Sequence, residues 1–366
     1  MQQNKIRVAV LFGGRSAEHE VSLQSARNVI AAIDPERFET ILIGIDRDGG
    51  WYLNDQSRPL LTADNLKLVA LNQRAQPTSL LASDQQGLLM SDGQAMGLID
   101  VVFPVLHGPY GEDGSVQGLA KLANVACVGS DILGSAIGMD KDVAKRLLRD
   151  SGIAVADYMV LRRHQLNESI GQQVSEKLGY PVYVKPANMG SSVGVSKVTC
   201  DAELVAALRH AFDYDIKVLV EAAVVGRELE CAVLGNDEPE VCDVVGEIIA
   251  DEQFYSYDRK YIEAAGAKLQ IPADVDAPTL ARLRQTALQA YQCLEARGMG
   301  RVDMFLTPDG EVLVNEINTL PGFTAISMYP KLWQASGVAP RELVTRLIEL
   351  ALDEYHDKQN LKKTEH

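Results

Sequence analysis

Two carboxylates and an amide near the carboxyl end of the chain are spaced for metal chemistry. Asp303 lies in the apolar run ArgValAspMetPhe, and Glu316 and Asn318 lie in ValAsnGluIleAsn. Alternate residues of a strand share a face, and the turn at 308–310 makes the two runs neighbours. One face therefore collects three oxygen donors beside Arg301. Oxygen donors without histidine or cysteine favour Mg²⁺ or Mn²⁺, commonly with substrate phosphates completing the shell. The alternative, a solvated Arg301–Asp303 salt bridge, fits such apolar runs less well.

A lysine and a glycine-serine loop point to phosphate binding. Lys185 ends the apolar run ValTyrValLysPro, where an ammonium group without an anion would be costly to bury. The following residues 190–195, GlySerSerValGlyVal, lie between two strand-like runs and read as a hairpin tip. Backbone N–H groups and hydroxyls at such a tip could cover phosphates. The alternative is a lysine that reaches water beside an ordinary hairpin, and these residues alone leave both open.

Other polar residues have a structural and a functional interpretation. Glu221 ends the run ValLeuValGlu, and Glu228 follows seven residues later; both could bind an adenine amino group or ribose hydroxyls, or be ordinary strand-end acids. Glu18 stands at the start of a helical run, where a capping acid is common. His107 opens a glycine-rich loop, and 252–261 reads as a functional loop or a surface excursion.

The amino-terminal part predicts a parallel sheet that would position such a site. Apolar runs at 7–12, 40–45 and 98–106 alternate with helical spacing at 16–33, which indicates a βαβ unit. Ligands bind at the carboxyl edge of such sheets. There is no Gly-x-x-x-x-Gly-Lys-Ser/Thr pattern, and Gly13-Gly14 lacks the third glycine of a dinucleotide fold. A P-loop enzyme is excluded and a dehydrogenase is disfavoured.

The rest of the chain predicts mixed strands and helices. Residues 54–97 read as excursions and edge strands, and the charged tail from His356 as frayed. Further strands are expected at 158–161, 180–186, 229–234, 241–249, 268–271, 301–306 and 311–317, and helices near 140–148, 165–178, 276–297 and 340–353.

Composition excludes several classes of protein. The 366 residues are 46% hydrophobic and 23% charged, which excludes wholesale disorder, and the net charge of −15 would repel a nucleic-acid backbone. Five scattered cysteines predict buried thiols in a reducing compartment. No apolar run approaches the roughly 20 residues of a membrane span, and the start has no secretory core. We therefore expect a cytoplasmic protein with no nucleic-acid or membrane partner.

Seven short motifs in order make the chain resemble D-alanine:D-alanine ligases of the ATP-grasp superfamily. The resemblance runs essentially from end to end. The motifs are GlyGlyArgSerAlaGluHisGluValSer (13–22), LeuHisGlyProTyrGlyGluAspGly (106–114), MetAspLys (139–141), ValLysProAlaAsnMetGlySerSerValGly (184–194), PheTyrSerTyrAspArgLysTyr (254–261), GlyArgValAspMetPhe (300–305) and AsnGluIleAsnThrLeuProGlyPheThr (315–324).

The resemblance implies a fold, cofactors and an assembly. The α/β fold would be ATP-grasp, with three α+β domains, the first built on a parallel sheet. It implies a substrate-binding domain over 1–138 and two ATP-grasp subdomains over 139–222 and 223–366, the last with the metal and catalytic residues. ATP and two Mg²⁺ (or Mn²⁺) ions would lie between the second and third domains, the D-alanines near the first, and the protein would be a homodimer.

The resemblance also implies roles for individual residues. It places Glu18 on the first ammonium group, linked to Ser191 and Tyr261 in a hydrogen-bonded triad. Arg301 and the backbone N–H near Gly322 would stabilise the oxyanion of the tetrahedral intermediate. The other implied roles are phosphate binding for Lys141 and Lys185, γ-phosphate binding for Lys260, adenosine binding for Glu221 and Glu228, metal binding for Asp303, Glu316 and Asn318, and substrate binding for His107 and Ser327, with Ser327 holding the second carboxylate.

Three other functions compete with this interpretation. A related ligase family joins D-alanine to D-lactate and differs chiefly in the 252–261 loop, where Tyr261 favours the dipeptide. A nucleotide-binding regulator of the same fold would have no use for Arg301 beside metal ligands. A dehydrogenase is supported only by the βαβ start.

Overall fold

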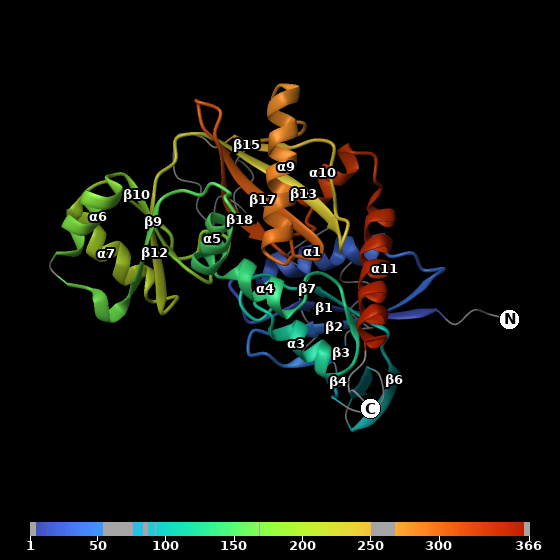
Figure 1. Cartoon of the computed structure of the whole chain (residues 1–366). Helices are drawn as coiled ribbons and strands as arrows, with labels where there is room; N and C mark the ends of the chain where they lie inside the picture. The colour runs from blue at the N-terminus through green and yellow to red at the C-terminus, as the bar shows by residue number, and fades with distance from the viewer. Residues whose placement is uncertain are drawn as a thin grey trace.

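The computed structural model describes residues 5–53, 76–82, 87–91, 93–167, 169–249 and 268–361. Its strands form three sheets, which Figure 1 shows as three groups, one of them set apart at one end of the molecule. The first sheet has the order β6-β5-β4-β3-β2-β1-β7-β8. Its strands are β1 (Ile6–Gly13), β2 (Phe38–Ile45), β3 (Trp51–Leu53), β4 (Gln76–Leu80), β5 (Leu88–Ser91), β6 (Gln94–Leu98), β7 (Val101–Val105) and β8 (Ala126–Cys127).

The first sheet is parallel only in its β2-β1-β7-β8 half, as expected from the βαβ start, and antiparallel from β2 to β6. The predicted edge strands are therefore present at β4 to β6, while 54–75 lies outside the described residues. Successive residues of β1 face two different cores because side chains alternate along a strand. Val8 and Val10 pack with α1 (His19–Ala32), and Ala9 packs with Val116 of α3 (Ser115–Leu122).

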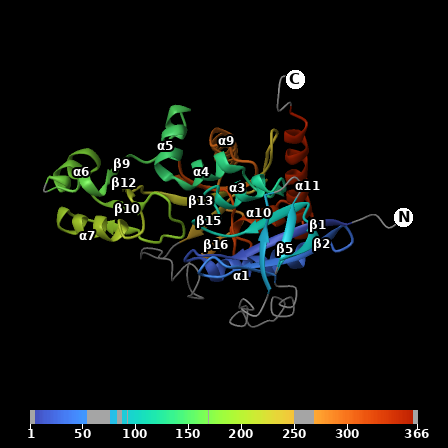
Figure 2. The same cartoon turned by 90° about the horizontal axis from the view of Figure 1, so that it is seen from below.

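The second sheet forms the separate group at one end of the molecule in both views (Figures 1 and 2). Its order is β11-β10-β12-β9, all antiparallel, and α6 and α7 pack against it. The expected hairpin around 190–195 is confirmed, since it joins β10 to β11. The elements are β9 (Tyr158–Arg162), α6 (Ile170–Leu178), β10 (Val182–Pro186), β11 (Ser196–Val198), α7 (Asp201–Ala211) and β12 (Lys217–Ala222).

The third sheet has the order β16-β15-β13-β17-β18 and shares a continuous core with one face of the first sheet. The short helices α4 and α5 lead from the first sheet toward the second, and α4 and α5 both contact β18. The elements are α4 (Ile132–Met139), α5 (Lys141–Asp150), β13 (Arg227–Gly235), β14 (Glu240–Val241), β15 (Gly246–Ile249), β16 (Lys268–Gln270), α9 (Ala277–Cys293), β17 (Gly298–Leu306), β18 (Val312–Asn318), α10 (Met328–Ala335) and α11 (Pro340–Gln359).

The last helix corrects one expectation. The tail was predicted to fray from His356, but α11 continues to Gln359. Its final turn is held by the first sheet's loops: Tyr355 donates to the Asn124 carbonyl at 3.1 Å, and the side chains of Gln359 and Asn124 meet at 2.6 Å. These long-range contacts, which no local pattern predicts, stabilise the turn and join it to the loop before β8.

The cysteine expectation is also partly wrong. All five cysteines are free, and Cys231 and Cys242 are buried, but Cys200, the residue before the first turn of α7, is exposed. No helix in the described part of the chain is long and apolar enough to cross a membrane. The boundaries expected after residues 138 and 222 fall at the ends of α4 and β12, and the domain division itself stays a prediction.

Candidate active site

The β17–β18 hairpin brings the predicted metal donors together. Its register pairs Arg301 with Asn318 and Asp303 with Glu316, and an irregularity follows Asp303. Because the pairing is antiparallel and alternate residues share a face, all four side chains lie on the same face. The opposite face carries Val302 and other apolar side chains that enter the core.

The charged groups on this face are paired with one another. Arg301 meets both carboxylate oxygens of Asp303 at 2.7 Å and contacts Glu230 on β13 at 2.9 Å. The Asn318 amide donates to Asp303 at 3.1 Å, and the Lys141 ammonium lies 3.2 Å from Glu316. The Arg301 and Asp303 side chains are only 19% and 15% exposed, so this is not the solvated surface salt bridge of the alternative interpretation.

This donor set fits a hard divalent cation. Two carboxylates and an amide oxygen are the ligands that Mg²⁺ accepts, and Arg301 and Lys141 now supply the positive charge beside them. Among the described residues there is no group of three or more His, Cys, Asp and Glu side chains suited to a metal. With so few protein ligands, water or phosphate oxygens would have to complete the coordination shell.

A small polar cavity of about 60 Å³ lies beside the hairpin. It is where the structure gathers residues predicted from distant motifs. The lining residues are Glu18, Val21, His107, Glu112, Gly190, Ser191, Arg301, Glu316, Asn318, Leu320, Pro321 and Gly322.

Glu18 links the first sheet to the hairpin loop of the second. The Ser191 hydroxyl donates to the Glu18 carboxylate in a short hydrogen bond that spans 173 positions of sequence. A side chain at Gly108 or Gly190 would come within 3.0 or 3.1 Å of Glu18, so glycine lets both loops approach it. Ser191 itself has φ 50°, a left-handed conformation that costs a non-glycine residue energy and marks a constrained loop. The contact excludes a purely capping role for Glu18, whose side chain makes no cap hydrogen bond.

The loop after β7 contributes a neutral histidine and an unusual glutamate. His107 Nε2 lies 3.2 Å from the Ser25 hydroxyl, and burial lowers the pKa of His107 despite the opposing charge of Glu18. The Gly108 N–H donates to Glu112 at 2.6 Å. Burial, reinforced by Glu18, nevertheless raises the pKa of Glu112 to about 8. The sequence interpretation assigned Glu112 no role, although its position in the 106–114 motif is a signal that could have found it.

Two lysines that were predicted to bind phosphate, Lys141 and Lys185, form ion pairs with glutamates near the cavity. The Lys185 ammonium contacts Glu221 at 2.6 Å, and its side chain is 13% exposed, which rules out the alternative of a lysine reaching water. Lys141 donates to the Met189 carbonyl at 2.8 Å. Burial alone would raise the pKa of Glu221, but Lys185 and Lys145 lower it to about 2.

Six of the predicted residues that the structure describes do not line the cavity: Lys141, Lys185, Glu221, Glu228, Asp303 and Ser327. Ser327 lies behind Gly322 at the start of α10, where its hydroxyl accepts the Thr324 N–H at 2.9 Å. Glu228 is exposed on β13. Lys260 and Tyr261 lie outside the described residues, so the proposed link from Ser191 to Tyr261 stays a prediction.

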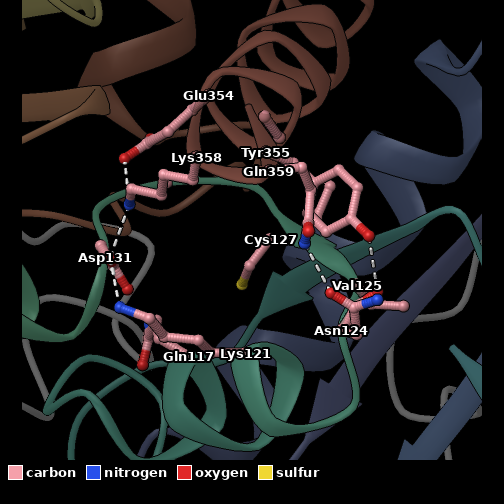
Figure 3. Close-up of a pocket in the computed structure, with 13 residues that line it drawn as sticks. Gln117, Lys121, Asn124, Val125, Cys127, Asp131, Glu354, Tyr355, Lys358 and Gln359 are labelled. Atoms are coloured by element: carbon pink, nitrogen blue, oxygen red, sulfur yellow. Dashed lines mark hydrogen bonds and ion pairs between the residues drawn. The ribbon is translucent and has the colours of Figure 1, made fainter. Parts of the chain in front are cut away.

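A larger cavity of about 270 Å³ lies elsewhere, between α3, β8 and α11, and Figure 3 shows the Cys127 thiol at its centre. Its charges are matched: Lys358 contacts Asp131 and Glu354, each at 2.6 Å, and Lys121 contacts Asp131 at 3.1 Å. Because these lysines already neutralise the acids beside them, the cavity presents no concentrated charge for ATP. The 60 Å³ cavity, which gathers residues of distant motifs, is the candidate active site.

Comparison with known families covers most of the chain. Residues 7–130 match the family described as "D-ala D-ala ligase N-terminus", and residues 147–349 match "D-ala D-ala ligase C-terminus". The two matched segments contain all the residues that line the candidate active site.

Individual proteins are similar over nearly their whole length. The chain is 52% identical to a D-alanine–D-alanine ligase of Proteus mirabilis over 99% of both chains, and 51% identical to D-alanine–D-alanine ligase A of Escherichia coli K12 over 98% of this chain and 99% of that one. Among solved structures, a D-alanine–D-alanine ligase from Coxiella burnetii aligns with a TM-score of 0.86 and 38% identity, over 98% of this chain and 97% of that one. The VanG D-Ala:D-Ser ligase from Enterococcus faecalis aligns with the same TM-score and identity, over 95% of this chain and 100% of that one.

Proposed function

Because the chain belongs to the D-alanine–D-alanine ligase family and therefore joins two D-alanines with ATP, we propose how its own side chains divide that reaction. The family binds ATP and a divalent metal, has the ATP-grasp fold and makes a peptidoglycan precursor. Its curated members are named as ligases of D-alanine to D-alanine, which favours D-alanyl-D-alanine over D-alanyl-D-lactate as the product. The same names argue against a regulator without catalytic activity and against a dehydrogenase.

The first step must activate a carboxylate, which is a poor electrophile. The carboxylate of the first D-alanine attacks the γ-phosphate of ATP, the bond between the γ-phosphorus and the bridging oxygen breaks, ADP leaves, and an acylphosphate forms. Lys141 and Lys185 would offset the crowded negative charge of the phosphates, together with Lys260. Glu221 and Glu228 would face the adenosine. A divalent metal supplies further charge neutralisation when bound, and Asp303, Glu316 and Asn318 would hold two such ions.

The second step forms the peptide bond. The free amine of the second D-alanine attacks the acylphosphate carbonyl, loses a proton and displaces inorganic phosphate. Before the phosphate leaves, an oxyanion develops at the carbonyl oxygen. Arg301 and the backbone N–H near Gly322 would stabilise this charge, because both line the cavity and a donor fixed in place costs no reorganisation. Glu230 and Asp303 hold the Arg301 guanidinium on the cavity side of β17.

The remaining cavity residues would bind and shield the substrates. Glu18 would hold the ammonium group of the first D-alanine, next to His107, which burial keeps neutral. Ser327 would hold the carboxylate of the second. The Glu18–Ser191 contact, extended to Tyr261, would close the hairpin loop over the site and exclude the water that hydrolyses an acylphosphate.

One observation carries this assignment: Glu18, His107, Ser191, Arg301 and Gly322, together with the hairpin carboxylate Glu316, come from five of the seven motifs and line one cavity. The experiment is phosphate release from ATP and Mg²⁺ with D-alanine, L-alanine, D-lactate or no acceptor, followed by product analysis. Only D-alanine should stimulate release, with D-alanyl-D-alanine as product. Release that is indifferent to D-alanine, or equal with L-alanine, would contradict the assignment.

We also propose Mg²⁺ or Mn²⁺ as the metal, a homodimer as the assembly and the cytoplasm as the location. The all-oxygen donor set supports the choice of metal, and the free thiols suit a reducing compartment. The family resemblance supports the dimer. Activity of metal-stripped enzyme with each ion, light scattering of the purified protein and cell fractionation test the three proposals separately.

A further inference from the structure

A third buried lysine lies beside the proposed phosphate site without a role in the mechanism above. Lys145 extends from α5, and its side chain is 1% exposed. Its ammonium group lies 2.8 Å from one oxygen of Glu221 and 6.0 Å from the centre of the Tyr158 ring. Burying an ammonium group costs desolvation free energy, which only a close anionic or hydrogen-bonding partner can offset.

Glu221 is shared between two cations. One of its oxygens contacts Lys185 at 2.6 Å, and the other contacts Lys145 at 2.8 Å. Two ammonium groups face one carboxylate in a place with almost no solvent; burial lowers the pKa of Lys145, and the adjacent charge of Glu221 opposes that shift. Such a cluster favours the approach of an anion, and Lys185, with its side chain 13% exposed, is the member that an anion could reach.

A phosphate group that binds Lys185 would draw its ammonium away from Glu221. If Lys185 were the only partner of that carboxylate, the movement would leave a buried negative charge uncompensated, which is strongly unfavourable. Lys145 removes this penalty because it stays beside the second oxygen. It cannot easily follow Lys185 to the phosphate, since its side chain is nearly inaccessible and α5 packs against β18 and α9.

We propose that Lys145 is the permanent counter-ion of Glu221, a positioning residue that allows Lys185 to bind the phosphates of ATP. This inference rests on the proposed phosphate role of Lys185. It also gives Glu221 a second duty besides adenosine binding: its carboxylate holds Lys185 in place until the nucleotide arrives.

The test measures phosphate affinity apart from catalysis. The variants are Lys145→Met and Lys145→Arg, and the measurements are the KM for ATP and inhibition by inorganic tripolyphosphate and by adenosine. Lys145→Met should raise the KM for ATP and the tripolyphosphate inhibition constant by at least about tenfold, because Lys185 must then stay with Glu221. The adenosine constant and the KM for D-alanine should change little, and Lys145→Arg should restore most of the phosphate affinity.

A double-variant cycle separates this role from simple stability. In a Glu221→Gln background no buried carboxylate needs a counter-ion, so adding Lys145→Met should change the tripolyphosphate constant by less than about threefold. This comparison is available even if the single Lys145→Met variant does not fold. Lys358→Met, which removes a lysine that pairs with Asp131 and Glu354 at the 270 Å³ cavity (Figure 3), should leave every nucleotide constant unchanged.

The outcomes distinguish the inference from the function on which it rests. If Lys185→Ala does not weaken tripolyphosphate binding, the phosphate role of Lys185 is wrong. If Lys185→Ala weakens it but Lys145→Met does not, only the counter-ion role is wrong. Equal loss of tripolyphosphate and adenosine affinity in Lys145→Met, or an effect of the same size in the Glu221→Gln background, would also overturn the counter-ion role.

Discussion

Replacing Glu112 by glutamine should stabilise the ligand-free enzyme at alkaline pH and not at acidic pH. Burial, with help from Glu18 and Glu316, raises the pKa of Glu112 from 4.5 to about 8. In the unfolded chain the carboxyl group ionises near its ordinary pKa. Between about pH 4.5 and pH 8 the native state therefore keeps a proton that the unfolded state has lost, so native stability falls as the pH rises through this window.

The size of the effect follows from that pKa difference. Each tenfold change in proton affinity is about 1.4 kcal/mol, so a pKa that rises from 4.5 to about 8 corresponds to an upper limit of roughly 5 kcal/mol. Glu112 keeps some exposed surface, which should reduce this to a few kcal/mol. Glutamine cannot ionise, and its carbonyl oxygen can still accept the Gly108 N–H that Glu112 accepts at 2.6 Å.

The assay is urea unfolding of both proteins in EDTA at several pH values from 4.5 to 8.5. The difference in unfolding free energy between Glu112→Gln and the wild type should grow steadily over this range and level off above pH 8. Glu238→Gln removes an exposed charge and serves as the control, whose difference should vary little with pH. A Glu112→Gln difference that is the same at pH 5 and pH 8 would refute the reasoning.

Three further substitutions test the proposed roles. Glu316→Gln removes a metal-binding charge, so it should abolish phosphate release while the unfolding temperature stays within a few degrees of the wild-type value. Turnover close to the wild-type rate would mean that the hairpin carboxylates are structural and do not bind the metal. Arg301→Lys keeps the charge but loses the two-pronged geometry, so kcat should fall about 10²- to 10³-fold with little change in the KM for ATP; an unchanged kcat in steady-state assays would remove Arg301 from the oxyanion site. Ser191→Ala removes one hydrogen bond to a buried carboxylate, worth about 1.5 to 3 kcal/mol, so kcat/KM for D-alanine should fall roughly 10- to 100-fold; an unaltered value would mean that the loop closes without this contact.

Local sequence patterns were sufficient to predict the strands and hairpins that carry the proposed metal-binding and phosphate-binding residues. Strand alternation and a tight turn predicted that Asp303 and Glu316 would face each other, and the register confirms that they do. The same reasoning predicted the β10–β11 hairpin and the parallel β2-β1-β7 core. These predictions succeed because neighbours in sequence determine which side chains share a strand face.

Motif order carried the sequence interpretation further than periodicity. Glu18 and His107 had ordinary structural explanations as isolated residues, and only the set of motifs pointed to a substrate site. The cavity that contains both residues agrees with that interpretation. The 106–114 motif contains Glu112 but does not show that its carboxyl group is buried, and no motif contains Lys145. Neither a glutamate in a loop nor a lysine in a helix has a local feature that predicts a buried charge.

The sequence by itself determined many of the strands, the facing donors of the terminal hairpin and the ligase family. It predicted helices where α1, α5, α6, α9 and α11 lie, but not α3, α4, α7 and α10. The tertiary structure decided which distant groups share one environment. It placed Glu18 against Ser191 across 173 positions, Lys145 beneath Glu221, and the last turn of α11 on Asn124. The physical reason is that backbone pattern acts over a few residues, whereas burial and charge compensation depend on which segments pack together. The proton affinity of Glu112 and the pairing of the phosphate lysines therefore arise only when the three sheets are assembled.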